Sequence, residues 1–278
     1  MKQEKTPDST PHIDLIGDDE IHLSKLADSE SEVRQGTVRL RLNLPSRHNT
    51  KLGRLVEMIN ADDEIYAMWE CANVNAVTRL GMTDHGPVHV HIVANIALKL
   101  FRLLVAANIQ PGIVKDHGLT QDDAEIVTVL GALCHDLGMS INRADHEQFS
   151  LFIVQTKLKE WLKELYPVRE ATIVRSEVLH AIISHRAGGK PLTLEAGIVR
   201  VADALDMSKG RSRIPFETGQ MTIHTLSAAA IDKITILGGG EKPIHIKVMM
   251  TNSAGIFQLD ELLKDKLKGS GLEAYVEV

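Results

Sequence analysis

Two long apolar segments place the strongest constraint on how this 278-residue chain can fold. Residues 87–107 and 121–135 are each long enough for several helical turns, and most of their side chains are apolar. A helix that is apolar nearly all round has to be buried among other elements. The pattern of the chain is helical from about residue 50 to about 208, so we expect a mainly α fold whose helices pack as a bundle.

Local signals predict where several of the helices begin. Asn49 or Thr50 can cap a helix that runs to about residue 60. Thr120 and Asp123 have the spacing of a capping box ahead of the second apolar segment. Thr193 can cap a last helix, in which apolar residues recur at helical spacing.

We expect three parts in the chain. Residues 1–35 hold nine acidic and four basic residues, which accounts for five of the six units of net negative charge, and they predict a flexible or loosely docked segment. Residues 36–215 would form the helical domain. Residues 216–278 predict a hairpin, an amphipathic helix and a closing strand, hence a small α+β domain. Its sheet could recruit a strand expected over 37–44, and an open sheet edge there would allow a homodimer.

The composition excludes several kinds of partner. Aromatic residues make up only 4% of the chain and no basic face is predicted, so we expect no nucleic acid partner. The two cysteines are isolated, as in proteins of a reducing compartment. The first residues have no apolar core of a signal peptide, and we expect no apolar stretch to approach the length of a membrane span. The sequence therefore predicts a cytoplasmic protein without a membrane partner.

Histidines and aspartates gather near the ends of the expected apolar helices. These residues are His85 and His89, His135 and Asp136, His146, His180 and His185, and Asp203 and Asp206. A single such pair can simply be favoured at a helix end. Several buried histidines and aspartates are costly unless they are paired or bind a metal. Helical bundles build metal sites from side chains of different helices. Mixed imidazole and carboxylate ligands suit Mn, Fe, Ni, Co or Zn better than Mg or Ca.

The order of these residues resembles a known family signature. His89 in "HVHIV", His135 and Asp136 in "LCHDLG" and Asp203 in "VRVADALD" are similar to the H…HD…D motifs of the HD superfamily of metal-dependent phosphohydrolases. The resemblance covers roughly residues 80–210. It implies an all-helical fold in which these four side chains hold one divalent metal.

Additional histidines resemble those of family members that hold a second metal, bridged by the aspartate of the dyad. His146 and His185 match these additions, and His180 is a further candidate that could equally hydrogen-bond a ligand. The sequence also departs from the family, because Met139 follows the glycine of the dyad where a phosphate-contacting lysine occurs in some members. We therefore expect one or two ions and leave the subfamily open.

The expected reaction is hydrolysis of a small phosphorylated substrate, such as a nucleotide, by a metal-activated hydroxide that Asp136 positions. Lys209, Arg211 and Arg213 follow the last ligand on the loop "DMSKGRSRIP". They would neutralise the charge that develops on the phosphoryl oxygens, although they could also form a solvated basic loop. Two alternatives are a mixed-valent di-iron oxygenase with the same ligands and a regulatory protein that senses a nucleotide.

Overall fold

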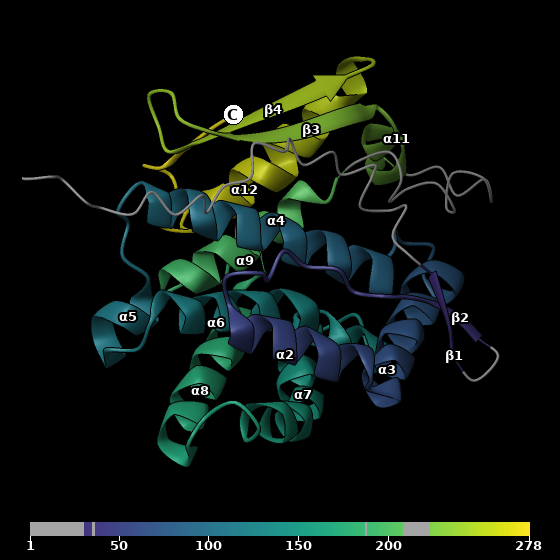
Figure 1. Cartoon of the computed structure of the whole chain (residues 1–278). Helices are drawn as coiled ribbons and strands as arrows, with labels where there is room; N and C mark the ends of the chain where they lie inside the picture. Colours follow the sequence, from purple (N-terminus) through teal and green to yellow (C-terminus); the bar gives the residue numbers. More distant parts are fainter. Residues whose placement is uncertain (1–30, 35–36, 187, 208–222) are drawn as a thin grey trace, which may run out of the picture.

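The computed structural model describes residues 31–34, 37–186, 188–207 and 223–278. Within these ranges the chain is mainly helical and ends in a small sheet, which confirms the expected fold class (Figure 1). The predicted flexibility of residues 1–35 falls almost entirely on residues outside the described ranges. The same holds for the predicted domain boundary at residue 215.

Three helices form the centre of the bundle: α4 (Pro87–Ala106), α6 (Gln121–Cys134) and α9 (Leu194–Leu205). They pack against one another and are buried along almost their whole length. The capping box predicted ahead of α6 is present, because the Thr120 side chain accepts from the Asp123 N–H while Asp123 accepts from the Thr120 N–H. The expected burial of the two apolar segments is confirmed.

The remaining helices of the bundle cover this centre. They are α2 (Thr50–Asn60), α3 (Asp63–Asn73), α5 (Gly112–His117), α7 (His146–Leu162) and α8 (Val168–Ser184). Asn49 and Thr193 cap α2 and α9 as predicted. In Figure 1, α7 and α8 lie below α6, whereas the C-terminal sheet lies above α4. The bundle therefore separates α7 and α8 from the sheet by its central helices.

Helix α4 corrects one expectation from the sequence. By length and composition it could cross a membrane, although no apolar stretch was expected to reach that length. In the fold, 83% of its most apolar 18-residue window is buried inside the protein. This is the burial of a core helix, and α4 packs against both α6 and α9.

The C-terminal part contains the predicted hairpin. Strand β3 (Ile231–Gly238) pairs antiparallel with β4 (Ile244–Met250), with Ile236 opposite Ile246, and β5 (Val276–Glu277) runs parallel to β4. Helix α11 (Ile223–Ala229) precedes the sheet, and a π-helical segment η5 (Gln258–Leu263) continues into α12 (Lys264–Leu267) between β4 and β5. The predicted amphipathic helix is thus short and partly π-helical.

The strand expected over 37–44 is shorter and has a different partner. Strand β2 (Thr37–Leu40) pairs with β1 (Ser31–Arg34) in a separate two-stranded sheet, so the expectation that the C-terminal sheet recruits it is wrong. The adjacent β1 segment reaches β2 through a very short connection, and local pairing of this kind carries a small entropic cost. The predicted homodimer stays a prediction.

Helix α9 holds the segment around α12 firmly in place. The guanidinium of Arg200 is buried and donates to the carbonyl oxygens of Asp265 and Lys268, at 2.9 and 3.1 Å. Gly197 lies so close to Ser270 that an added Cβ would be 2.2 Å from the Ser270 carbonyl oxygen. The C-terminal part is therefore fixed to the helix that carries Asp203.

Candidate metal centre

The histidine–aspartate dyad lies in a tight turn at the end of α6. His135 is the first residue after the helix, Asp136 follows, and residues 137–140 form a single 3-10 turn, η2 (Leu137–Ser140). A side chain at Gly138 would place its Cβ 1.9 Å from the carbonyl oxygen of His146, so only glycine lets the start of α7 approach this closely. The Ser150 hydroxyl accepts from the Gly138 N–H at 2.8 Å and lies 2.8 Å from the His135 carbonyl oxygen. These contacts bind α7 to the dyad.

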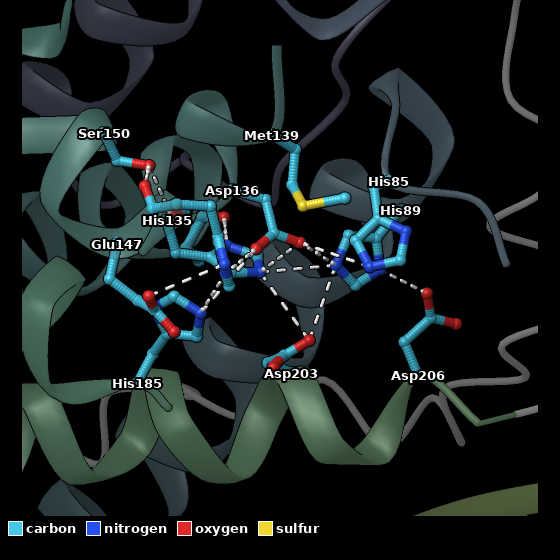
Figure 2. Close-up of polar contacts among 12 residues, drawn as sticks. His85, His89, His135, Asp136, Met139, Glu147, Ser150, His185, Asp203 and Asp206 are labelled. Atoms are coloured by element: carbon cyan, nitrogen blue, oxygen red, sulfur yellow. Dashed lines mark hydrogen bonds and ion pairs between the residues drawn. The ribbon is translucent and has the colours of Figure 1, made fainter. Parts of the chain in front are cut away.

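One oxygen of Asp136 faces a first group of ligands. Its Oδ2 lies 3.4 Å from His89 Nε2 and 3.2 Å from His135 Nε2. Asp203 Oδ1 lies 3.5 Å from His89 Nε2 and 3.6 Å from His135 Nε2 (Figure 2). Helices α4 and α9 and the end of α6 thus bring together the four residues of the resemblance, all of them buried.

The other oxygen of Asp136 faces a second group. Its Oδ1 lies 3.1 Å from His146 Nε2 and 3.6 Å from His185 Nε2, and these two nitrogens are 3.4 Å apart. His146 begins α7 and His185 follows α8, so this group draws on different helices from the first. Asp136 therefore lies between two clusters of nitrogen atoms, with one carboxylate oxygen toward each.

Hydrogen bonds at the outer edge of the site set the ring orientation of three of these histidines. The Nδ1 atoms of His89, His135 and His185 each face an oxygen at 2.6–2.8 Å; these oxygens belong to the Asp206 carboxylate, the Ala132 carbonyl and the Ile182 carbonyl, respectively. A carbonyl or carboxylate oxygen accepts, so the ring donates its Nδ1–H and directs Nε2 to the centre. A metal-binding histidine is held in this way in known sites.

The charges of the site perturb its pKa values. Burial alone would raise the pKa of Asp136, but the imidazoles of His135, His146 and His89 hold it well below its usual range. Burial would lower the pKa of His135, yet Asp136 and Asp203 together raise it to about 9. The pKa of His185 is held well below its usual value by burial and by the charge of His135. An ionised Asp136 and a neutral His185 are states that bind a metal, whereas the raised pKa of His135 means that this imidazole has to lose a proton first.

These residues fit a metal better than a set of ordinary ion pairs. Potential ligand atoms of His89, His135 and Asp203, and separately those of His135, Asp136 and His185, all lie within 4.8 Å of one another. Imidazole nitrogens that face each other at 3.3–3.4 Å repel unless a proton or a cation lies between them. Nitrogen and carboxylate donors in this mixture match the divalent transition metals Mn, Fe, Co, Ni and Zn.

One predicted ligand, His180, does not join the two groups. The structure places His180 on α8, half-buried, where its Nε2 accepts from the Leu192 N–H at 2.9 Å. His180 and His185 are five residues apart, which separates them by about 140° around a helix axis, so the two rings face different sides. Lys209, Arg211 and Arg213 lie outside the described residues, and their predicted role stays a prediction.

Three functional candidates were given no role from the sequence, although Asp206 was noted among the gathered aspartates. Asp206 bonds the outer nitrogen of His89, as described above. Glu147 is buried beside His146 and His185, forming a third group whose potential ligand atoms lie within 4.8 Å of one another. Lys266 of α12 donates a hydrogen bond to Asp203 Oδ2. Glu147 directly follows His146 in the sequence and could have been suspected, whereas Lys266 is 63 residues away from its partner.

Comparison with known proteins agrees with this geometry. The HD domain family model matches residues 87–208. A protein of Methanocaldococcus jannaschii, described as uncharacterized protein MJ1020, is 45% identical over 207 residues, which is 74% of this chain and 80% of that protein. No solved structure matches the chain. The chain belongs to the HD domain family, whose members are mostly metal-dependent phosphohydrolases.

Proposed function

We propose that the chain is a metal-dependent phosphohydrolase that acts on a nucleotide or another small phosphoester. The observation that carries the proposal is the position of Asp136, whose two carboxylate oxygens face two separate groups of inward-directed nitrogens. A carboxylate in this position can bridge two ions. His89, His135 and Asp203 would complete one position, and His146 and His185 the other.

The protein's own groups would then divide the work of hydrolysis. Divalent transition metals held at these positions supply Lewis acidity and activate water near neutral pH. The ionised carboxylate of Asp136 would contribute one oxygen to each position and would orient water beside them. His85 is buried, and its Nε2 lies 4.0 Å from Asp136 Oδ2, while its Nδ1 donates to the Thr83 carbonyl oxygen at 2.6 Å. Its Nε2 is therefore placed to exchange a proton with water or with a leaving group.

Charged groups near the site favour phosphate ester hydrolysis over oxygenation. Lys266 places an ammonium against Asp203 at the edge of the site, and an anionic substrate gains from that charge. The loop with Lys209, Arg211 and Arg213 follows α9 directly in the sequence, so these side chains are proposed to neutralise charge on the phosphoryl oxygens.

The test is a phosphoester panel with metal-loaded protein. Metal-free protein would be loaded with Mn, Fe, Co, Ni or Zn, and release of phosphate or cleavage of diesters would be measured with mononucleotides, polyphosphates and cyclic nucleotides. Asp136→Ala should abolish turnover and lower the metal content. Asp116→Ala, on the exposed side of α5, serves as the matched control and should behave as the wild type.

Two results would count against the proposal. One is a fully loaded protein that leaves the whole panel untouched, and the other is an Asp136→Ala variant with unchanged turnover. A mixed-valent electron-resonance signal after anaerobic iron loading, without phosphate release, would favour the oxygenase. Tight nucleotide binding without turnover would favour the regulatory alternative.

A further inference from the structure

The C-terminal part of the chain contributes a cation to the candidate metal centre. Lys266 lies on α12, donates a hydrogen bond to Asp203 Oδ2, and has a side chain that is 16% exposed. Asp203 Oδ1 faces His89 and His135 in the first group of ligands. The lysine and the metal position therefore lie on opposite oxygens of one carboxylate, and the lysine side chain is not sealed from solvent.

The fold holds this lysine in position through contacts on both sides of it. Arg200, one turn before Asp203 on α9, donates to the carbonyl oxygens of the residues at positions 265 and 268. Ser270 bonds the Leu267 carbonyl oxygen at 2.6 Å, and its own backbone touches Gly197. A buried arginine and a close backbone contact thus fix the backbone around Lys266 relative to Asp203. A surface ion pair of ordinary kind does not need such support.

An ammonium group can donate three hydrogen bonds. Among the described residues, Asp203 is the one hydrogen-bonding partner of Lys266 Nζ, which leaves two N–H groups for another acceptor. Lysine is a common point-charge partner of phosphate oxygens.

We infer that Lys266 forms a phosphate-binding subsite of the metal centre, so that the C-terminal part completes the site formed by the helical domain. The ligand is the phosphoryl group of the substrate, or inorganic phosphate after hydrolysis. This inference rests on the proposed function for the identity of the substrate. Its physical content is the binding of a phosphate by Lys266 beside the ions.

The test measures phosphate binding apart from catalysis. Full-length wild type and Lys266→Met, each loaded with Mn, would be titrated calorimetrically with inorganic phosphate, and the metal-free forms with Mn. We expect Lys266→Met to weaken phosphate binding about ten- to hundredfold, as for loss of a hydrogen bond to a charged group. Mn affinity should stay equal or rise, because the substitution removes a positive charge beside Asp203.

Three further variants make the result specific. Lys264→Met changes the same kind of residue on the same short helix, where the side chain is 76% exposed and pairs with Asp260, and it should bind phosphate as the wild type does. Lys266→Arg should retain most of the affinity. If Lys266→Met unfolds at a lower temperature than the wild type, Lys266→Gln, which can still bond Asp203, is judged by the same criterion.

The inference is overturned if Mn-loaded wild type binds no phosphate, if the neutral variants at position 266 bind it equally well, or if Mn and phosphate affinity fall in parallel. The last result would mean that Lys266 only supports the fold of the site. Phosphate binding that depends on Lys266 in a protein that hydrolyses no ester would refute the proposed function and leave this inference intact. Ester hydrolysis, together with phosphate binding that Lys266→Met leaves unchanged, would refute this inference and leave the proposed function intact.

Discussion

The Asp206 carboxylate offers a sharp test of the metal centre because it binds the predicted ligand His89 on the side of the ring that faces away from the centre. Its Oδ2 lies 2.6 Å from His89 Nδ1, and both side chains are buried. Losing a carboxylate behind a metal-binding imidazole weakens metal binding about 10- to 100-fold. A hydrogen bond to a charged group contributes about 1.5–3 kcal/mol, and this free energy converts to about the same fold-change in affinity. Asp206→Asn, which keeps the shape and removes the charge, should therefore weaken one metal position by at least about tenfold.

Calorimetric titration of the metal-free protein with Mn would measure this effect. His89 belongs to the group with Asp203 and not to the group with His146 and His185, so only one of two binding events should weaken. Asp116→Asn on exposed α5 is the control, and an unchanged unfolding temperature would exclude a general loss of structure. The reasoning fails if Asp206→Asn binds Mn at wild-type affinity, or if both binding events weaken to the same extent.

The further predictions concern protons, packing and turnover. The pKa of His135 is raised to about 9 in the metal-free protein, so Mn affinity should fall at least about tenfold for each pH unit below that value, and a flat profile in titrations between about pH 6 and 8 would contradict this. The raised pKa of His135 also stabilises the metal-free fold, fully below about pH 6.5 and no longer above about pH 9. Urea unfolding of the metal-free protein should therefore give a lower free energy of unfolding as the pH rises through about 9. Gly138→Ala should lower the free energy of unfolding by about 1–3 kcal/mol or more, because its Cβ meets the His146 carbonyl, whereas Gly53→Ala in α2, with 3.6 Å to its nearest neighbour, should be neutral or stabilising. His85→Gln should lower kcat at least about tenfold while Mn content stays unchanged, and equal loss of both would assign His85 to metal binding instead.

The parts of the fold that could be predicted from the sequence depend on local chemistry. The capping box at Thr120 and Asp123 is complete within four residues, so its position follows from the sequence alone. The strand around residue 37 was also predicted by its alternation. Its pairing partner was not, because pairing depends on which other segment lies nearby and the alternating pattern does not encode that.

In the candidate site, too, the residues in local sequence motifs could be predicted, whereas those that depend on long-range packing could not. The histidines and aspartates of the dyad and its neighbours occur in recognisable frames, and the structure brings six of the seven predicted metal ligands together. The seventh, His180, differs because five residues along a helix rotate the side chain away from its neighbour. Lys266 was missed because its segment has the pattern of an ordinary amphipathic helix. Its role depends on docking against α9, 63 residues earlier in the chain.

The contact between Gly138 and the His146 carbonyl has a consequence for how such a centre can vary. Backbone atoms meet there, and backbone atoms have no rotamers through which a gap could be adjusted. The main chain at the junction of η2 and α7 thus fixes how closely the turn with His135 and Asp136 approaches His146. If the site holds metal ions as proposed, an exchange for a larger or smaller ion would have to be accommodated by the ligand side chains, because the backbone contact leaves no room to adjust.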